Sequence, residues 1–178
     1  MLRYSLIFGG IIGAIVITFM SVVLISMGTD SLFSSEAAGY AIMLVVLSLV
    51  FVGIKRYRDM EQGGVITFVQ GASVGAGIAA VAGVIYAIGW EFSLMATDYA
   101  FIEAYSQSLI DGVAAKDIDE TAKAAEIAEI NASVEMYRNP LFRLPITFIE
   151  IFPVGLIVAL VSALILKNAK VLPARVAA

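Results

Sequence analysis

The sequence predicts an all-α, polytopic membrane protein, with four transmembrane helices and an extracytoplasmic helical hairpin between the third and fourth. Hydrophobic residues make up 61% of its 178 residues and charged residues 15%, and the mean hydropathy is +0.96. Soluble domains contain roughly 45–50% apolar and about 25% charged residues, so this composition excludes a water-soluble fold. The apolar residues also gather in long runs, as membrane-spanning helices require.

Four such runs define the predicted spans. At about 1.5 Å per residue, a run of roughly 20 residues crosses the hydrocarbon core of a bilayer. The first run is too long for a cleavable signal peptide, which has about 7–15 apolar residues. The third exceeds what a bilayer needs, so we expect it to tilt or to extend beyond the membrane. Within one domain, residues 1–178, we expect spans at about 5–28, 37–54, 63–90 and 144–166.

The basic residues indicate the orientation, because Lys and Arg near span ends resist translocation. One side of the predicted spans carries seven of them: Arg3, Lys55, Arg56, Arg58, Lys167, Lys170 and Arg175. We therefore expect both termini on the cytoplasmic side. The segment 91–143, with ten acidic and four basic residues, is then outside.

Helical patterning in 91–143 predicts the hairpin. Its first arm is expected to continue the third span outward and to end at Asp111-Gly112. The second arm can begin at Asp117 or Asp119, and Asn139-Pro140 stops it before the fourth span. One apolar face of each arm carries the pattern: Phe92, Met95, Tyr99, Ile102 and Leu109, then Ile127, Ile130, Val134 and Tyr137.

Glu150 is the ionisable residue that lies well inside a predicted span. Such residues are costly and usually face a bundle interior, so we expect Glu150 to be buried and mostly protonated there. Tyr40 and Tyr86 are the preferred hydrogen-bond partners, with Thr18 and Ser21 as others. Glu150 either binds a proton or cation, or only locks the bundle together. Pro153 is expected to kink the same helix by freeing the carbonyl of Ile149.

Small residues recur every four positions on the third and fourth spans, a spacing that lets helix backbones approach closely. This pattern predicts tight packing within one bundle, or alternatively the seam of a homodimer. The residues are Gly71, Gly75, Ala79, Gly83 and Ala87 on the third span, and Gly155, Ala159 and Ala163 on the fourth.

A charged string closes the second predicted span. Basic side chains at such a position hold the end of the helix at the cytoplasmic surface and can meet anionic lipid head groups. We interpret the string as a topology anchor, with lipid recognition or docking of a partner as the alternatives. It consists of Lys55, Arg56, Tyr57, Arg58 and Asp59.

Several segments together resemble a family of small bacterial inner-membrane proteins catalogued as domain of unknown function 4199. They are GIKRYRD after the second span, YAIGWEF at the end of the third, EMYRNP, and TFIEIFPVGLIVALVSALIL in the fourth. The resemblance implies a four-span protein of the bacterial inner membrane and no known activity. At the family's motif positions stand Thr147, Glu150, Pro153 and Gly155, and also Tyr57, Arg58, Asp59 and Asn139-Pro140.

The composition favours a non-enzymatic role. The sequence has no Cys and no His, which excludes disulfides and Cys- or His-ligated metal sites, and we expect no cofactor. The net charge of −4 argues against a nucleic-acid partner. We expect membrane lipids and another membrane protein or a second copy as partners. A small proton- or cation-linked transporter or channel using Glu150 is the alternative, and a lipid-handling enzyme using Glu150 and the Asp98–Glu103 surface is a third.

Overall fold

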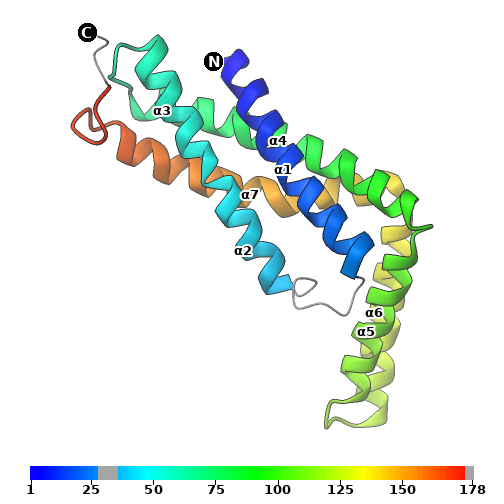
Figure 1. Ribbon diagram of the computed structural model, residues 1–178. Helices are drawn as coiled ribbons and strands as arrows, with labels where there is room; N and C mark the ends of the chain where they lie inside the picture. The colour runs from blue at the N-terminus through cyan, green and yellow to red at the C-terminus, as the bar shows by residue number, and fades with distance from the viewer. Residues whose placement is uncertain (28–35, 175–178) are drawn as a thin grey trace.

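A computed structural model describes residues 1–27 and 36–174. This part of the chain folds into seven α-helices without a strand, in the order shown in Figure 1. They are α1 (Leu2–Met27), α2 (Glu36–Leu47), α3 (Leu49–Glu61), α4 (Phe68–Ala96), α5 (Ala100–Ala114), α6 (Glu120–Arg138) and α7 (Pro140–Leu166).

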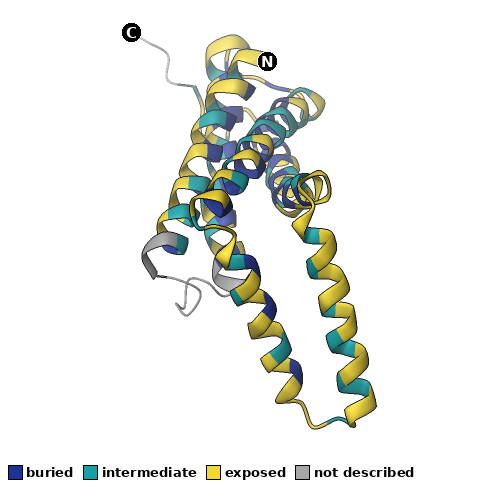
Figure 2. Ribbon diagram, turned by 90° about the vertical axis from the view of Figure 1, so that its right-hand side faces the viewer, coloured by how far each residue is buried: buried dark blue, intermediate teal, exposed yellow. Residues whose placement is uncertain are grey.

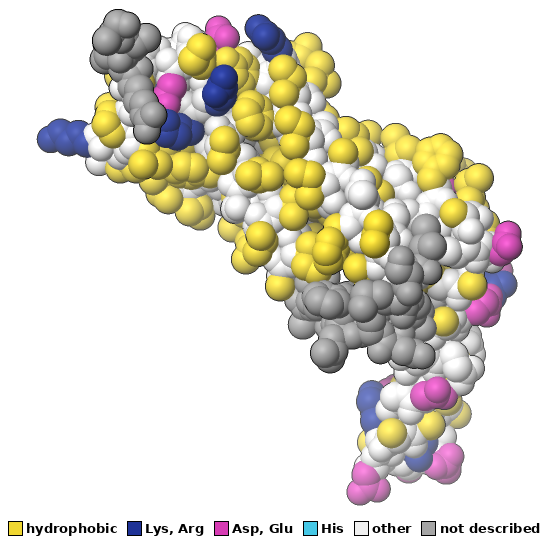
Figure 3. Space-filling view, in the orientation of Figure 1, with side chains coloured by type: hydrophobic (Ala, Val, Ile, Leu, Met, Phe, Trp, Pro, Cys, Tyr) yellow, Lys and Arg dark blue, Asp and Glu magenta, His cyan; other side chains and the backbone are white. Residues whose placement is uncertain are grey.

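Four segments are long and apolar enough to cross a membrane, which confirms the predicted class of fold. They are Leu2–Leu24, Gly39–Glu61, Phe68–Ala96 and Pro140–Leu166. Apolar side chains spread over the surface of these helices, whereas charged side chains gather toward the two ends of the molecule (Figure 3). Large apolar groups therefore face outward where lipid would surround the bundle.

The second span consists of two helices that meet at Ser48. The backbone N–H of Ser48 still donates to Leu44 at 3.0 Å, and the Ser48 hydroxyl donates to the Val45 carbonyl at 2.6 Å. The chain thus passes through this point with helical hydrogen bonding. α3 then continues to Glu61 rather than ending near residue 54, because Tyr57 and Arg58 are buried against the bundle.

The small residues of α4 and α7 face each other along an antiparallel seam. A Cβ built on Gly75 would lie 2.6 Å from Cβ of Ala159, and one built on Gly155 would lie 2.8 Å from Cβ of Ala79. Gly71 meets Ala163 in the same way, at 3.0 Å. The backbones of the two helices therefore approach as closely as small residues permit.

A second four-residue ladder joins α1 to α4, which run in parallel. A Cβ on Gly9 would lie 2.6 Å from Cβ of Val81, and one on Gly13 would lie 2.8 Å from Cβ of Ile85. Further along the same ladder, the hydroxyl groups of Ser21 and Ser93 lie 2.6 Å apart. The central helix α4 thus packs closely on both α1 and α7, and both contacts are made within one chain.

α5 and α6 form a hairpin that projects from one end of the bundle (Figure 1). The sequence predicts that the first arm continues α4, and this prediction is wrong. The chain turns between the two helices at Asp98 and Tyr99, whose φ angles are 49° and 59°. α5 also runs past Gly112 to Ala114. Asp119 caps α6, because its side chain accepts a hydrogen bond from the Ala122 amide at 2.9 Å. Of the two starts that the sequence allows, Asp117 and Asp119, the structure therefore uses Asp119.

The hairpin is mostly exposed (Figure 2). No residue of α6 is buried, although α5 buries Ile102, Ser106 and Val113. Asn139 ends α6 and also caps α7, because its side chain accepts from the Leu141 amide at 3.0 Å. Pro140 therefore separates the two helices at the predicted place, since proline suits the first position of a helix.

Candidate functional site

A buried ion pair joins the last turns of α4 to the first turn of α7. The Arg143 side chain is 1% exposed. Its Nε donates to Oε2 of Glu91 at 2.8 Å, and its Nη2 donates to Oε1 at 2.5 Å. Two parallel hydrogen bonds between a guanidinium and a carboxylate fix the orientation of both groups. The pair therefore locks the end of the α4–α7 seam.

Arg143 also holds the hairpin. Its Nη1 donates to the carbonyl oxygens of Tyr137 at 2.8 Å and Arg138 at 3.2 Å, the last residues of α6. Its guanidinium carbon lies 5.3 Å from the ring centroid of Tyr99 and 5.7 Å from that of Tyr137. The buried guanidinium of Arg143 thus contacts both the turn before α5 and the end of α6, and it lies against aromatic rings, as arginine side chains often do.

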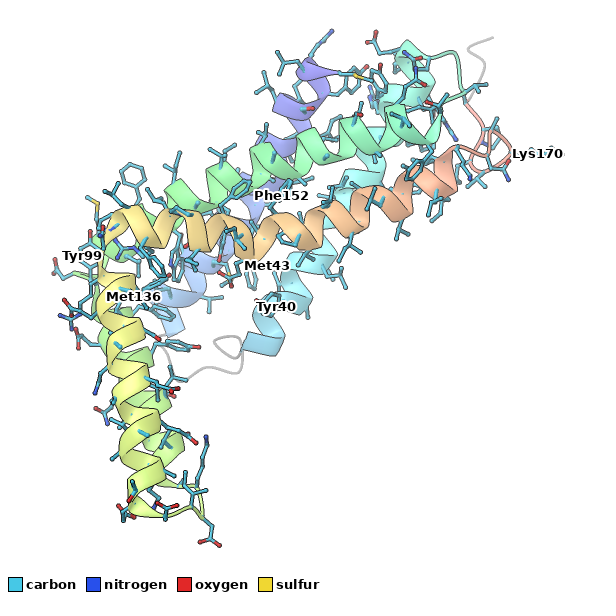
Figure 4. The ribbon with its side chains drawn as sticks, turned by 180° about the vertical axis from the view of Figure 1, so that it is seen from behind. Tyr40, Met43, Tyr99, Met136, Phe152 and Lys170 are labelled. Atoms are coloured by element: carbon cyan, nitrogen blue, oxygen red, sulfur yellow. The ribbon has the colours of Figure 1, made fainter. Side chains whose placement is uncertain are left out.

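Two further hydrogen bonds complete this group. The hydroxyl of Tyr99, the residue at the left-handed turn, donates to Oε1 of Glu91 at 3.2 Å. Nε1 of Trp90 donates to the hydroxyl of Tyr137 at 3.0 Å. Burial raises the pKa of Tyr137, although the bond from Trp90 acts in the opposite direction. We call Trp90, Glu91, Tyr99, Tyr137 and Arg143 the hairpin clamp; Figure 4 labels Tyr99, at the base of the hairpin.

A cavity of about 1080 Å³ lies between the bundle and the hairpin. Its bundle side is lined by residues of α1, α2 and α4 and by Glu150 of α7. Its other side is lined by both arms of the hairpin, down to Lys116 and Glu126. This volume is close to the upper end of the roughly 300–1,000 Å³ of small-molecule sites, and the lining combines apolar and aromatic side chains with a few polar groups, as such sites do.

Aromatic rings follow one another along the cavity wall. Tyr86 stacks on Trp90 with centroids 6.5 Å apart, and Trp90 meets the ring of Phe101 edge to face at 5.2 Å. Phe101 in turn stacks on Tyr105 at 5.7 Å. All four rings line the cavity, so an aromatic surface runs from the membrane helices into the first arm.

Glu150 lines this cavity together with Tyr40 and Tyr86, but it is exposed. The prediction that Glu150 is buried in the bundle interior is therefore wrong. The face of α7 that packs on α4 follows the stripe of Thr147, Ile151 and Gly155, and residue 150 lies about 100° around the helix from residue 151. Tyr86 is 2% exposed and Tyr40 47% exposed, so the three groups come from different depths.

The other partners that the sequence allows for Glu150 lie elsewhere. Ser21 is bonded to Ser93 and to the Ile17 carbonyl, and Thr18 is exposed. Thr147 is buried beside the hairpin clamp, at 2% exposure. α7 runs through Pro153, and also through Pro145, as one helix, and the expected kink stays a prediction.

The charged string after the second span is divided between two environments. Arg58 is fully buried and donates to the carbonyl oxygens of Val171 at 2.9 Å and Leu172 at 2.5 Å, beyond the end of α7. Its Nε donates to Asp59 at 2.7 Å, and Lys55 pairs with the same carboxylate. Arg56 is exposed. Arg58 thus holds the chain after α7, whereas Arg56 faces outward.

Sequence reasoning missed the Glu91–Arg143 pair, yet the small-residue pattern carries the signal for it. Gly75 lies opposite Ala159 and Ala79 opposite Gly155, so each step of four forward on α4 is a step of four back on α7. Three more steps beyond Ala79 place Glu91 opposite Arg143. Opposite charges in register at the ends of two antiparallel helices predict an ion pair.

The geometry defines a helical membrane protein with four apolar spans, a clamped hairpin and a cavity beneath it. Within residues 1–27 and 36–174, no three acidic side chains gather closely enough to hold a metal ion. The family model described as "Protein of unknown function (DUF4199)" matches residues 7–168, so the chain belongs to this family. No curated protein and no solved structure matches the chain.

Proposed function

We propose that this chain is a non-enzymatic protein of the bacterial inner membrane that works as an interaction subunit of a larger membrane assembly. The observation that carries the proposal is the hairpin. It is fixed at its base by the hairpin clamp, yet α6 buries none of its residues within the chain. A rigid, exposed projection supplies surface for a partner at a small entropic cost of binding.

The orientation belongs to the same proposal. The N-terminus, the end of α3 and the chain after α7 lie toward one end of the bundle, and the hairpin projects from the other (Figure 1). The first three segments carry Arg3, Lys55 and Lys170, whereas the hairpin is acidic. Basic residues near span ends favour the cytoplasmic side, so both termini are cytoplasmic and the hairpin is extracytoplasmic. The sequence has no Cys, so single cysteines at Asp117 and Lys170 can be labelled in intact cells without background. We expect an impermeant maleimide to label position 117 but not position 170. Labelling at 170 but not at 117 would show that the orientation is the opposite of the one proposed.

The hairpin is a better partner surface than the small-residue ridges. Those ridges are occupied by the α4–α7 and α1–α4 contacts within one chain, so they leave little room for the seam of a homodimer. A different protein bound to α6 accounts for the exposed arm without a second copy of the bundle. A homo-oligomer that joins through its hairpins is the other form of this proposal.

Photo-crosslinking in the native membrane tests the partner. A photoreactive residue at Ala128 or Asn131, both exposed on α6, should give one discrete heavier adduct. The same residue at Ile157, which is 62% exposed on α7, is the control and should give only lipid adducts. A chain that yields no protein adduct from α6, and that purifies alone as a monomer, is not an interaction subunit.

A cation-linked transporter is the second candidate, and the position of Glu150 favours it. This carboxylate lies about 10 Å along α7 from Arg143 and lines the large cavity. Vesicles that contain the protein and a trapped pH indicator test it. A proton flux down an imposed gradient that is faster for the wild type than for Glu150→Gln supports transport, and equal slow fluxes exclude it.

A further inference from the structure

The cavity between the bundle and the hairpin has the features of a ligand site. It is lined mainly by apolar and aromatic side chains, and both arms contribute to it from the clamp to the tip. The arms are seen side by side in Figure 2, joined at the tip. Apolar residues on their inner sides include Ile102, Leu109, Val113, Ile130 and Val134. Water is a poor filling for such a groove, because apolar surface is costly to hydrate.

The charges of the lining indicate the sign of the ligand. Among the described residues that line the cavity, Glu126, Glu129 and Glu150 are acidic and Lys116 is basic. Lys116 forms an ion pair with Glu126 at the tip of the hairpin. The bundle end contains Glu150 and no basic residue among the described lining, so this end attracts a cation.

The rings at the same end strengthen that preference. Tyr40, Tyr86, Trp90 and Tyr137 line the cavity together with Glu150. The faces of aromatic rings attract cations, ammonium groups among them, and tryptophan does so best. Figure 4 shows Tyr40 and Met43 on α2, whose end lies toward the hairpin. A carboxylate among aromatic rings is therefore suited to a protonated amine rather than to an anion.

We propose that this cavity binds an amphiphile with a protonated amine, its ammonium group beside Glu150 and its apolar chain between the arms of the hairpin. The chain of the ligand follows α5 from Phe101 toward Gly112, a path of about 17 Å. The proposal goes beyond the interaction role, since it requires neither a partner protein nor transport.

The single tryptophan of the sequence, Trp90, lines the cavity and reports on its contents. The probe is bromododecylamine, whose bromine quenches tryptophan fluorescence on contact, added to the purified protein in a neutral maltoside detergent. Bromododecanoate, with the same chain and the opposite charge, is the matched probe. We expect saturable quenching by the amine at concentrations at which the carboxylate quenches weakly.

Two pairs of variants locate the ligand. Glu150→Gln should raise the concentration of amine needed for half-quenching at least about tenfold, since a charged partner is lost. Glu135→Gln, on α6 but outside the cavity, should leave it unchanged. Gly112→Phe should block binding, because Gly112 lines the cavity and a Cβ there meets no atom within 4 Å, so a ring fits at this position without displacing its neighbours. Gly10→Phe, which has the same free space but lies outside the cavity, is its control.

Each result decides the proposal. Quenching that is equal for the amine and the carboxylate, or that rises without saturation, shows partition into detergent only and overturns it. Unchanged binding in Glu150→Gln overturns the placement of the ammonium group, and unchanged binding in Gly112→Phe overturns the placement of the chain. Because Gly112→Phe introduces a better helix former at an open position, a loss of binding in this variant does not arise from misfolding.

Discussion

Glu91 and Arg143 form a bidentate ion pair at the same antiparallel register that places Gly75 against Ala159. The pair lies where the seam between α4 and α7 ends and the hairpin begins. Its two functions follow from this position. The pair neutralises two charges, each of which would be costly to bury without the other, and it fixes the direction in which α5 and α6 leave the bundle.

Replacing Glu91 by Gln should therefore destabilise the protein severely. The buried Arg143 then lacks a compensating charge, and breaking such a pair costs about 3–5 kcal/mol. Thermal unfolding in detergent, followed by circular dichroism, measures the loss. The control is Glu103→Gln, whose pair with Arg138 is exposed and should be worth less than about 1 kcal/mol. Similar melting temperatures for the two variants would contradict this role of the clamp.

Arg58 should be required for the segment after α7. Its guanidinium donates to the carbonyl oxygens of Leu166, Val171 and Leu172, and Ala at this position leaves them without that donor. We expect Arg58→Ala to cost about 1–3 kcal/mol and to speed proteolysis within 167–174. Arg56→Ala, at an exposed neighbour, should behave like the wild type. Equal cleavage rates in the two variants would show that Arg58 does not hold this segment.

Much of this fold follows from simple patterns. The length of each apolar run predicts the four spans, and the four-residue spacing of Gly71, Gly75 and Ala79 predicts a close helix contact. The residues that cap and stop helices predict a start at Asp117 or Asp119, of which the structure uses Asp119, and a stop at Asn139-Pro140. These signals are local, or repeat along one helix, and so a single sequence contains them.

The rest depends on which face of each helix points inward. Hydrophobicity does not mark the inner face of a span, because lipid is as apolar as a protein core. The sequence therefore places Glu150 too deep in the bundle, and nothing in the charged string marks Arg58 as the member that is buried. The turn at Asp98 and Tyr99 also escaped prediction, because its left-handed conformation is held by contacts of Tyr99 with residues distant in sequence.

A large side chain should not fit the seam between α4 and α7. Leu at Gly75 places its Cβ 2.6 Å from that of Ala159 and 2.8 Å from Cδ1 of Ile54, so the backbones must separate. We expect a loss of about 1–3 kcal/mol or more in the free energy of unfolding. Gly10→Leu is the matched control, since nothing lies within 4 Å of a Cβ there, and it should change stability by about 0.5 kcal/mol or less.

Tyr137 should make the protein sensitive to alkali. Burial raises its pKa, so the folded state keeps the phenol neutral at a pH where the unfolded chain releases the proton. This contribution to stability is complete below the ordinary pKa of about 10 and is lost as the pH rises through the folded value. Tyr137→Phe should therefore lose less stability than the wild type between neutral pH and pH above about 10. Parallel melting curves across that range would contradict the prediction.

Glu150 should matter little for stability. Its side chain is exposed on the lining of the cavity rather than packed in the bundle core. We expect Glu150→Gln and Glu150→Leu to unfold within about 1 kcal/mol of the wild type, as exposed substitutions usually do. A marked loss of stability in Glu150→Leu, with Glu150→Gln unaffected, would instead indicate a carboxylate whose hydrogen bonds hold the bundle together. Thermal unfolding in the same detergent as for Glu91→Gln allows the two positions to be compared directly.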